Sequence, residues 1–229
     1  MLLVVANKLY SSWSLRPWIL MRALGIAFDE ETIAMRQPDT KARMLAHGPT
    51  GKCPVLIDGG ITIWESLAII EYLAEAFPDK GVWPAGRAAR AHARAIANEM
   101  HAGFQPLRAS CPMNLSKRFA ARDLGPDVAT SVARIEQLWR QARATFGGKA
   151  GGPFLFGAFC GADAMYAPVT TRLDTYQINV AADTRAYMDA VLTHPAFVEW
   201  RAGALAEPKA WDVAQYEEGH VAVEGFRKQ

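Results

Sequence analysis

The spacing of hydrophobic residues divides the chain into two parts of different character. In the first part, short apolar runs typical of strands alternate with stripes in which apolar residues recur every three or four positions, as on one face of a helix. Gly59-Gly60 lies between two β-rich runs, which is typical of a hairpin. The pattern predicts strands over residues 2–5, 28–34, 55–58 and 61–64, and helices over 13–24, 38–46 and 66–77.

From about residue 87 the spacing is helical almost throughout. Amphipathic helices are expected over residues 87–108 and 128–146, and further helical patterns begin near residues 162, 181 and 195. Only Phe154–Phe156 suggests another strand, and the tail after about Glu207 has no clear period and is expected to wrap or fray. The predicted fold class is therefore α/β plus all-α: a βαβαββα domain over residues 1–78, a linker over 79–87, and an all-helical domain over 88–229.

Composition and charge narrow the function classes. The 229 residues are 51% hydrophobic and 21% charged, with a net charge of +2, which is ordinary for a globular protein and argues against a nucleic-acid or anionic-membrane role. No apolar run approaches the length of a membrane helix, and Met1–Val5 is too short for a signal peptide. The three cysteines lie far apart, so we expect reduced thiols in the cytoplasm. The five histidines show no metal-binding spacing, and no metal is expected.

Hydroxyl residues gather between the first strand and the first helix, at Ser11, Ser12 and Ser14. A helix N-terminus presents free backbone N–H groups and a partial positive charge. Hydroxyls placed there either cap the helix or hold an anion such as a thiolate.

Two further boundaries carry candidate chemistry. Cys53-Pro54 enters the third strand, where a proline marks a turn, an edge or a cis bond, and where Cys53 is either reactive or a half-buried core thiol. Glu65-Ser66 opens the third helix. There Glu65 suits an ammonium and the helix N-terminus suits a carboxylate, unless Ser66 is a simple N-cap.

The order of these features resembles the cytosolic glutathione transferases, and most closely their serine-type zeta class. The resemblance covers most of residues 1–110, and a later run resembles the folding motif of the family. It implies a thioredoxin-like first domain, a homodimer, and glutathione as co-substrate. The runs that carry it are Ser11–Arg16, Cys53-Pro54, Ile57–Gly59, Ile61–Leu73, Gly103–Leu107 and Phe156–Asp163.

The resemblance also implies roles for single residues. Ser11 matches the catalytic serine that donates to the glutathione sulfur, with Tyr10 as the rival partner, and Arg16 either adds positive potential or is a solvated helix residue. Asp163 is implied to lie in the helical core, the alternative being a surface position, and Cys160 replaces the usual Ser or Thr cap. The residues that match glutathione-binding positions are Ser12, Cys53, Pro54, Glu65, Ser66 and Gln105.

The implied activity is conjugation of glutathione to a small hydrophobic electrophile, as in cytoplasmic detoxification. Two alternatives remain: a glutathione-dependent cis–trans isomerase like maleylacetoacetate isomerase, and a non-enzymatic transferase-like binding protein. Trp13 replaces the cysteine common in the zeta-class serine loop, which counts against the isomerase, whereas a buried cationic pocket would favour it. The segment 109–114 also departs from the class and is expected to border the second-substrate pocket.

Overall fold

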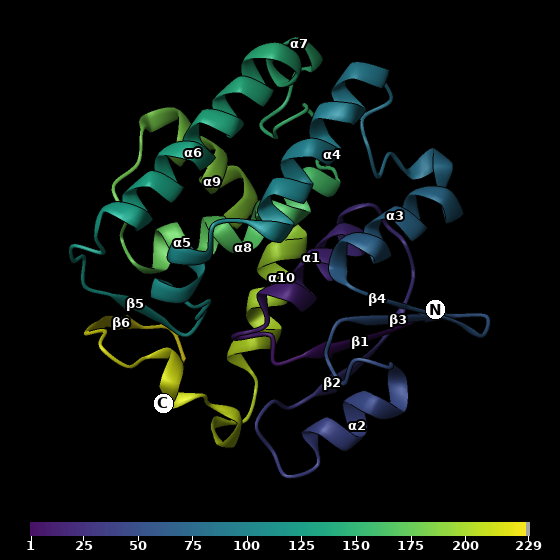
Figure 1. Cartoon of the computed structure of the whole chain (residues 1–229), viewed down its shortest axis with the longest axis vertical. Helices are drawn as coiled ribbons and strands as arrows, with labels where there is room; N and C mark the ends of the chain where they lie inside the picture. The colour runs from purple at the N-terminus through teal and green to yellow at the C-terminus, as the bar shows by residue number, and fades with distance from the viewer. Residues whose placement is uncertain (228–229) are drawn as a thin grey trace.

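The computed structural model describes residues 1–227 of the chain, and its N-terminal part is built on a four-stranded sheet (Figure 1). The strand order is β2-β1-β3-β4, with β2 parallel to β1 and the other two pairs antiparallel. This is the predicted βαβαββα order. Its elements are β1 (Leu2–Ala6), α1 (Ser12–Ala23), β2 (Asp29–Ile33), α2 (Thr40–His47), β3 (Val55–Asp58), β4 (Ile61–Trp64) and α3 (Ser66–Ala76).

The central strand β1 is buried on both faces, and its side chains alternate between two cores. Leu3 and Val5 belong to the large core that includes residues of α1 and α3, whereas Val4 and Ala6 pack with Met44 of α2. Helices therefore cover both faces of the sheet, with α2 on one side and α1 and α3 on the other (Figure 1). An apolar run without polar alternation is what such a doubly covered strand requires.

The C-terminal part is mostly helical and is centred on α8. Every residue of α8 except Asp174 is buried, and the helix packs against both α1 and α4. One continuous hydrophobic core consequently runs through both parts of the chain. After a short 3₁₀ turn over Pro78–Lys80, the helices are α4 (Arg87–Ala102), α5 (Gln105–Ser110), α6 (Pro126–Ala142), α7 (Gly148–Ala150), α8 (Gly161–Thr175), α9 (Ala182–Leu192) and α10 (Pro195–Leu205).

Two predicted helix boundaries are wrong. The helix expected over 87–108 is interrupted, because Gly103 is extended and Phe104 has a positive φ of 60°, so that α5 starts in a new direction. The helix expected over 128–146 starts earlier, at Pro126, and its last turn widens into a π-helical segment over Arg143–Gly147.

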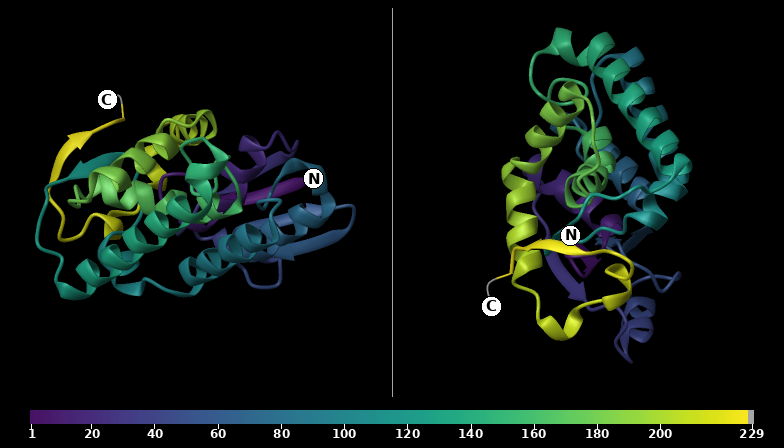
Figure 2. Two further views of the ribbon diagram at one scale, coloured as in Figure 1. Left: turned by 90° about the horizontal axis from the view of Figure 1, so that it is seen from above. Right: turned by 90° about the vertical axis from the view of Figure 1, so that its left-hand side faces the viewer.

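The structure also contains a small antiparallel sheet that the apolar spacing did not predict (Figure 2). Its strands are β5 (Lys117–Phe119) and β6 (Ala222–Gly225). One strand has only three residues and the other is fully exposed, so neither carries an alternating apolar pattern. The expected strand over Phe154–Phe156 is reduced to isolated bridges, and the tail after Glu207 wraps onto the protein through two 3₁₀ turns and β6.

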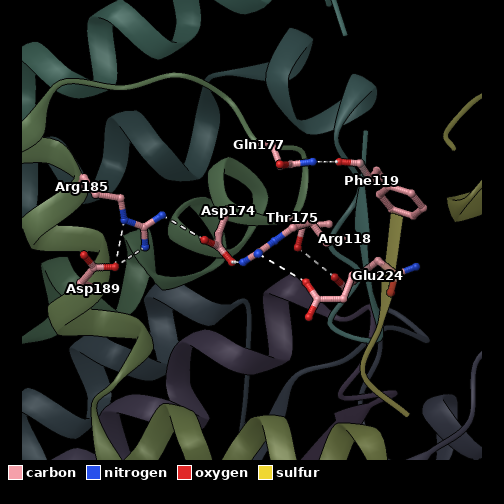
Figure 3. Close-up of polar contacts among 9 residues, drawn as sticks. Arg118, Phe119, Asp174, Thr175, Gln177, Arg185, Asp189 and Glu224 are labelled. Atoms are coloured by element: carbon pink, nitrogen blue, oxygen red, sulfur yellow. Dashed lines mark hydrogen bonds and ion pairs between the residues drawn. The ribbon is translucent and has the colours of Figure 1, made fainter. Parts of the chain in front are cut away.

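An ionic network fastens this small sheet to the helices (Figure 3). Arg118 of β5 pairs with Asp174 of α8 at 3.1 Å and with Glu224 of β6 at 3.4 Å. Asp174 also accepts from Arg185 of α9 at 2.9 Å. Single exposed ion pairs contribute little, but a shared network holds several elements in one geometry.

Asp163 lies in the core of the helical part, so a surface position for it is excluded. Its carboxylate accepts hydrogen bonds from the backbone N–H groups of Leu155 at 3.0 Å and Cys160 at 2.9 Å, and from the Tyr187 hydroxyl at 3.1 Å. Cys160 is the N-cap of α8. Burial raises the pKa of Asp163 to about 6, although the hydrogen bonds oppose this shift.

Candidate functional site

Ser11 lies at the N-terminus of α1 and caps the helix. Its oxygen accepts from the Ser14 N–H at 3.3 Å, and its hydroxyl donates to the Ser14 oxygen at 2.8 Å. The Ser14 oxygen in turn accepts from the Ala6 N–H at 3.0 Å, which links the helix to the end of β1. The capping arrangement therefore places Ser11 at the carboxyl end of the central strand, beside a cavity.

Ser12 is bound from the other domain. Its oxygen accepts from Nη2 of Arg172 at 3.2 Å, and this buried arginine of α8 also donates to the carbonyls of Cys111 at 2.8 Å and Pro168 at 3.4 Å. Ser12 thus joins the serine loop, which we define as residues 7–14, to the central helix α8. The Ser12 oxygen accepts in this contact.

Two cavities meet at the serine loop. The larger, of about 510 Å³, lies between the sheet domain and α5, and the smaller, of about 150 Å³, lies toward the start of α3. Trp13 and Cys53 line both. The predicted residues in the larger cavity are Ser11, Ser12, Cys53 and Gln105, and those in the smaller are Cys53, Pro54 and Glu65.

The Cys53–Pro54 peptide bond is cis, one of the three arrangements that the sequence left open. Burial raises the pKa of the Cys53 thiol to about 12, with a smaller contribution from Glu31. The thiol therefore stays protonated near neutral pH, which agrees with the core-thiol interpretation and not with a reactive one.

Glu65 and Ser66 stand at the start of α3 in an unusual backbone conformation. Glu65 has a positive φ of 69°, and its carboxylate lies 3.9 Å from Nε2 of His101. Ser66 is fully buried, and its hydroxyl has no hydrogen-bond partner within residues 1–227. A buried hydroxyl without a partner is costly, and Ser66 itself lines neither of the two cavities.

Trp13 lies between two guanidinium groups. Arg16 lies 4.1 Å from the centre of its ring and Arg108 lies 4.6 Å from it, both within cation–π range. Of the two interpretations of Arg16, the solvated one is wrong, because this residue is fully buried. None of its guanidinium nitrogens has a hydrogen-bond partner in the described chain. Burial, and next the charges of Arg172 and Arg108, hold the pKa of Arg16 well below its usual value.

Arg16, Arg108 and Arg172 together make the region beside Ser11 and Ser12 cationic. Within residues 1–227 none of the three pairs with a carboxylate. Burial lowers the pKa of Arg172 to about 10, so this group still carries its charge at neutral pH. Uncompensated positive charge in a partly buried site favours an anionic ligand.

Several residues around the larger cavity were not predicted. Arg172 had a readable signal, since it is the one basic residue of α8 and is buried there. Arg108 and Tyr216 had none, because their position depends on the break at Phe104 and on the path of the tail. Ala109, Pro112 and Met113 of the segment 109–114 line this cavity.

Grouped metal-ligand side chains or a long apolar helix would mark other kinds of site. Among residues 1–227, no three His, Cys, Asp or Glu side chains are grouped so that they could hold a metal ion. Within the same range, no helix has both the length and the apolar character needed to span a bilayer.

Known proteins resemble this chain in sequence and in fold. Residues 10–76 match the family model of the glutathione S-transferase N-terminal domain. A probable maleylacetoacetate isomerase from Caenorhabditis elegans is 37% identical over 103 residues, which cover 43% of this chain and 48% of that relative. The chain thus matches about half the length of this curated relative.

Solved structures extend the likeness to the whole chain. A bacterial maleyl pyruvate isomerase, described as a zeta-class glutathione S-transferase, has a TM-score of 0.67 at 22% identity, covering 91% of this chain and 99% of that one. A glutathione transferase homologue from Burkholderia with bound glutathione has a TM-score of 0.65 at 20% identity, covering 89% and 97%. At such identities the likeness concerns the fold, and it confirms the predicted fold class.

The sequence match over residues 10–76 and the shared fold lead to one conclusion. Residues 10–76 of this chain match the N-terminal domain of the glutathione S-transferases, and the chain as a whole has the fold of solved glutathione transferases.

Proposed function

We propose that the protein is a glutathione transferase that joins the glutathione sulfur to a small hydrophobic electrophile. The observation that carries the proposal is the convergence of Ser11, Cys53-Pro54 and Glu65 on two adjoining cavities, with the unpartnered Ser66 hydroxyl beside them. In this assignment residues 1–78 hold glutathione, and residues 88–229, after the linker 79–87, supply most of the electrophile site.

The residues fit the parts of glutathione by charge. Glu65 and the start of α3 suit the ammonium and carboxylate of the γ-glutamyl group, because a helix N-terminus favours an anion. The backbone beside Pro54 suits the cysteinyl part. Ser12 and Gln105 suit contacts in the larger cavity, where both lie.

Ser11 and the cationic cluster act on the sulfur. Glutathione supplies a thiol whose ordinary pKa is about 8.5, and only its thiolate is a good nucleophile. A hydroxyl donor at the N-terminus of α1, near three arginines without carboxylate partners, favours that thiolate at neutral pH. Water carries the proton away, so the chain needs no general base.

The family resemblance supports the remaining parts of the proposal. We place the protein in the cytoplasm, as a homodimer engaged in detoxification. The decisive experiment is calorimetric titration with glutathione, followed by an assay of glutathione-dependent turnover with a panel of electrophiles that includes chlorodinitrobenzene. Heat of binding together with turnover supports the proposal, and absence of both contradicts it.

Ser66→Ala is expected to raise the Michaelis constant for glutathione by about tenfold to a hundredfold, the scale of a hydrogen bond to a charged group. The γ-glutamyl end is bound alike before and during reaction, so turnover at saturating glutathione should change little. Because the hydroxyl has no internal partner, the variant should melt at or above the wild-type temperature. A fall in turnover with unchanged glutathione affinity would reject this role.

A second function is favoured by the arginines. Arg108 and Arg172 line the same cavity as Ser11, and two such cations suit a dicarboxylate with a cis double bond, such as maleylacetoacetate or maleylpyruvate. This observation supports the glutathione-dependent isomerase. Trp13 does not remove the cationic character that the isomerase needs, because its ring stacks on Arg108 at 4.6 Å.

Arg108→Met separates the two functions. With a dicarboxylate substrate kcat/KM should fall by about tenfold to a hundredfold, since a charge-assisted contact is lost. With chlorodinitrobenzene the change should be smaller, because this substrate carries no charge. Arg87→Met, at an exposed position at the start of α4, is the matched control. Equal losses with both substrates would argue against a dicarboxylate site.

A further inference from the structure

The tail after α10 forms a strap, which we define as residues 207–227. Figure 1 shows it in yellow, leaving α10, passing the lower edge of the molecule and ending beside β5. The strap contains two 3₁₀ turns, Lys209–Trp211 and Ala214–Tyr216, followed by β6. It crosses next to the loop of residues 7–10, which leads from β1 into Ser11.

The strap contacts each of the residues 7–10 that precede Ser11. Glu207 accepts from two successive backbone N–H groups, those of Lys8 at 2.5 Å and Leu9 at 3.3 Å. The side-chain amide of Asn7 donates to the Trp211 carbonyl at 3.1 Å. A carboxylate that holds two consecutive amides fixes the direction of the peptide between them.

The far end of the strap is fastened separately. Glu217 accepts from Asn114 at 3.2 Å and pairs with Lys117, while β6 pairs with β5. Figure 3 shows Glu224 joined through Arg118 to Asp174. The strap is thus tied to the helical domain at one end and to the serine loop at the other.

Between these anchors Tyr216 lies at the wall of the larger cavity. Its ring packs against Tyr10 with centroids 5.4 Å apart, and it shares the cavity with Ser11 and Met113. An aromatic ring held there presents an apolar surface to whatever molecule reacts with the sulfur.

We propose that Glu207 is a positioning residue of the serine loop, and that the strap it fastens places Tyr216 against the electrophile. The proposal rests on the proposed function, since it concerns the orientation of Ser11 and the second substrate. Glu207 itself lines neither of the two cavities. It acts through Lys8 and Leu9, whose amides it holds.

Burial makes Glu207 sensitive to pH, and two neighbouring cations oppose its effect. The Lys8 ammonium, itself paired with Glu30 at 2.7 Å, and the Arg227 guanidinium, paired with Asp212 at 2.6 Å, are the charges that face it. Burial outweighs both and raises the pKa of Glu207 to about 7. Protonation below that value weakens one of its two acceptor oxygens.

Hydrogen exchange of the loop amides tests the proposal without any assay of activity. In Glu207→Gln an NH₂ group replaces one of the two acceptor oxygens, so the protection factor of residue 8 or of residue 9 should fall at least tenfold. Glu218→Gln, on the exposed part of the same strap, should leave both unchanged. In the wild type the protection should weaken as the pH falls below about 7, and in Glu207→Gln it should lose this dependence.

Kinetic measurements test whether the loop orients Ser11 and whether Tyr216 contacts the electrophile. Glu207→Gln should lower turnover about tenfold with little change in glutathione affinity, because Ser11 loses its orientation rather than its contacts. Tyr216→Ala should raise the Michaelis constant for the electrophile and leave the loop amides protected. Unchanged protection in Glu207→Gln would overturn the proposal, as would lost protection without any kinetic effect. If the wild type has no glutathione-dependent activity but Glu207→Gln still frees the loop, the proposed function fails and the hold on the loop stands.

Discussion

Ser11→Ala is expected to lower the rate of glutathione conjugation by about 10- to 1000-fold, the scale on which enzymes lose rate when an electrostatic donor is removed. Glutathione affinity should change little, because the hydroxyl matters most when the sulfur carries charge. The direct measurement is the pKa of the bound glutathione thiol, followed by the ultraviolet absorbance of the thiolate during a pH titration. In Ser11→Ala the pKa of the bound thiol should rise toward the free value of about 8.5.

The hydrogen bonds of Ser11 and Ser12 bear on which hydroxyl donates to the glutathione sulfur. While Ser11 caps α1, its hydroxyl donates to the Ser14 oxygen at 2.8 Å. The hydroxyl must therefore rotate before it can donate to sulfur. Ser12 accepts from Arg172 and keeps its own proton available. Ser14→Ala is the control, since it removes the acceptor of the Ser11 proton but keeps the backbone N–H that Ser11 caps. A larger loss in Ser12→Ala or Tyr10→Phe than in Ser11→Ala would transfer the role to that residue.

Asp163→Ala is expected to lower the free energy of unfolding by about 2–4 kcal/mol, because buried donors lose their acceptor. Three donors are affected: the N–H groups of Leu155 and Cys160 and the Tyr187 hydroxyl. They join the start of α8 to the preceding loop and to α9, so the loss should loosen the central helix. Denaturant unfolding of the variant and the wild type measures the difference.

The difference in unfolding free energy between Asp163→Ala and the wild type should depend on pH. The folded-state pKa of Asp163, about 6, lies above the value of about 3.9 for an unfolded Asp. Between these values the folded protein binds a proton that the unfolded chain has lost, so the contribution of Asp163 to stability falls as the pH rises from about 4 to about 6. The cost of Asp163→Ala should therefore be larger at pH 5 than at pH 7.

Cys160→Ser serves as the companion variant. It installs a better N-cap on α8 and should be neutral or stabilising by up to about 1 kcal/mol. An Asp163→Ala protein that unfolds like the wild type but lacks activity would overturn the structural role and place Asp163 in the active site.

The N-terminal domain was predictable because local signals and tertiary structure agree there. The run that contains Leu3 and Val5 is apolar enough for a strand covered on both sides, and Gly59-Gly60 marks the hairpin in which β3 and β4 pair. The candidate residues were found for the same reason. Ser11, Pro54 and Glu65 all stand at boundaries of elements, and the boundaries of neighbouring strands and helices meet at one edge of the sheet.

The remaining features depend on contacts between distant segments. The break before α5 results from a positive φ at Phe104, a residue that does not favour this conformation on its own. The pairing of β5 with β6 joins segments about a hundred residues apart, and Glu224 is exposed on a strand without an apolar face. The contact of Arg172 with Ser12 depends on the packing of α8 against α1.

The serine loop bonds to residues that lie far away in the sequence, and this affects folding during synthesis on the ribosome. Asn7 and Lys8 are among the first residues made, but they bond to Trp211 and Trp200, which follow 204 and 192 positions later. At about 5–20 residues per second, translation of that interval takes roughly 10–40 s. The sheet strands have left the ribosome long before then. The loop before Ser11 cannot form its bonds to Trp200 and Trp211 until those residues have been made. The Ser11 end of the four-stranded sheet is therefore among the last parts of the nascent chain to reach its final form.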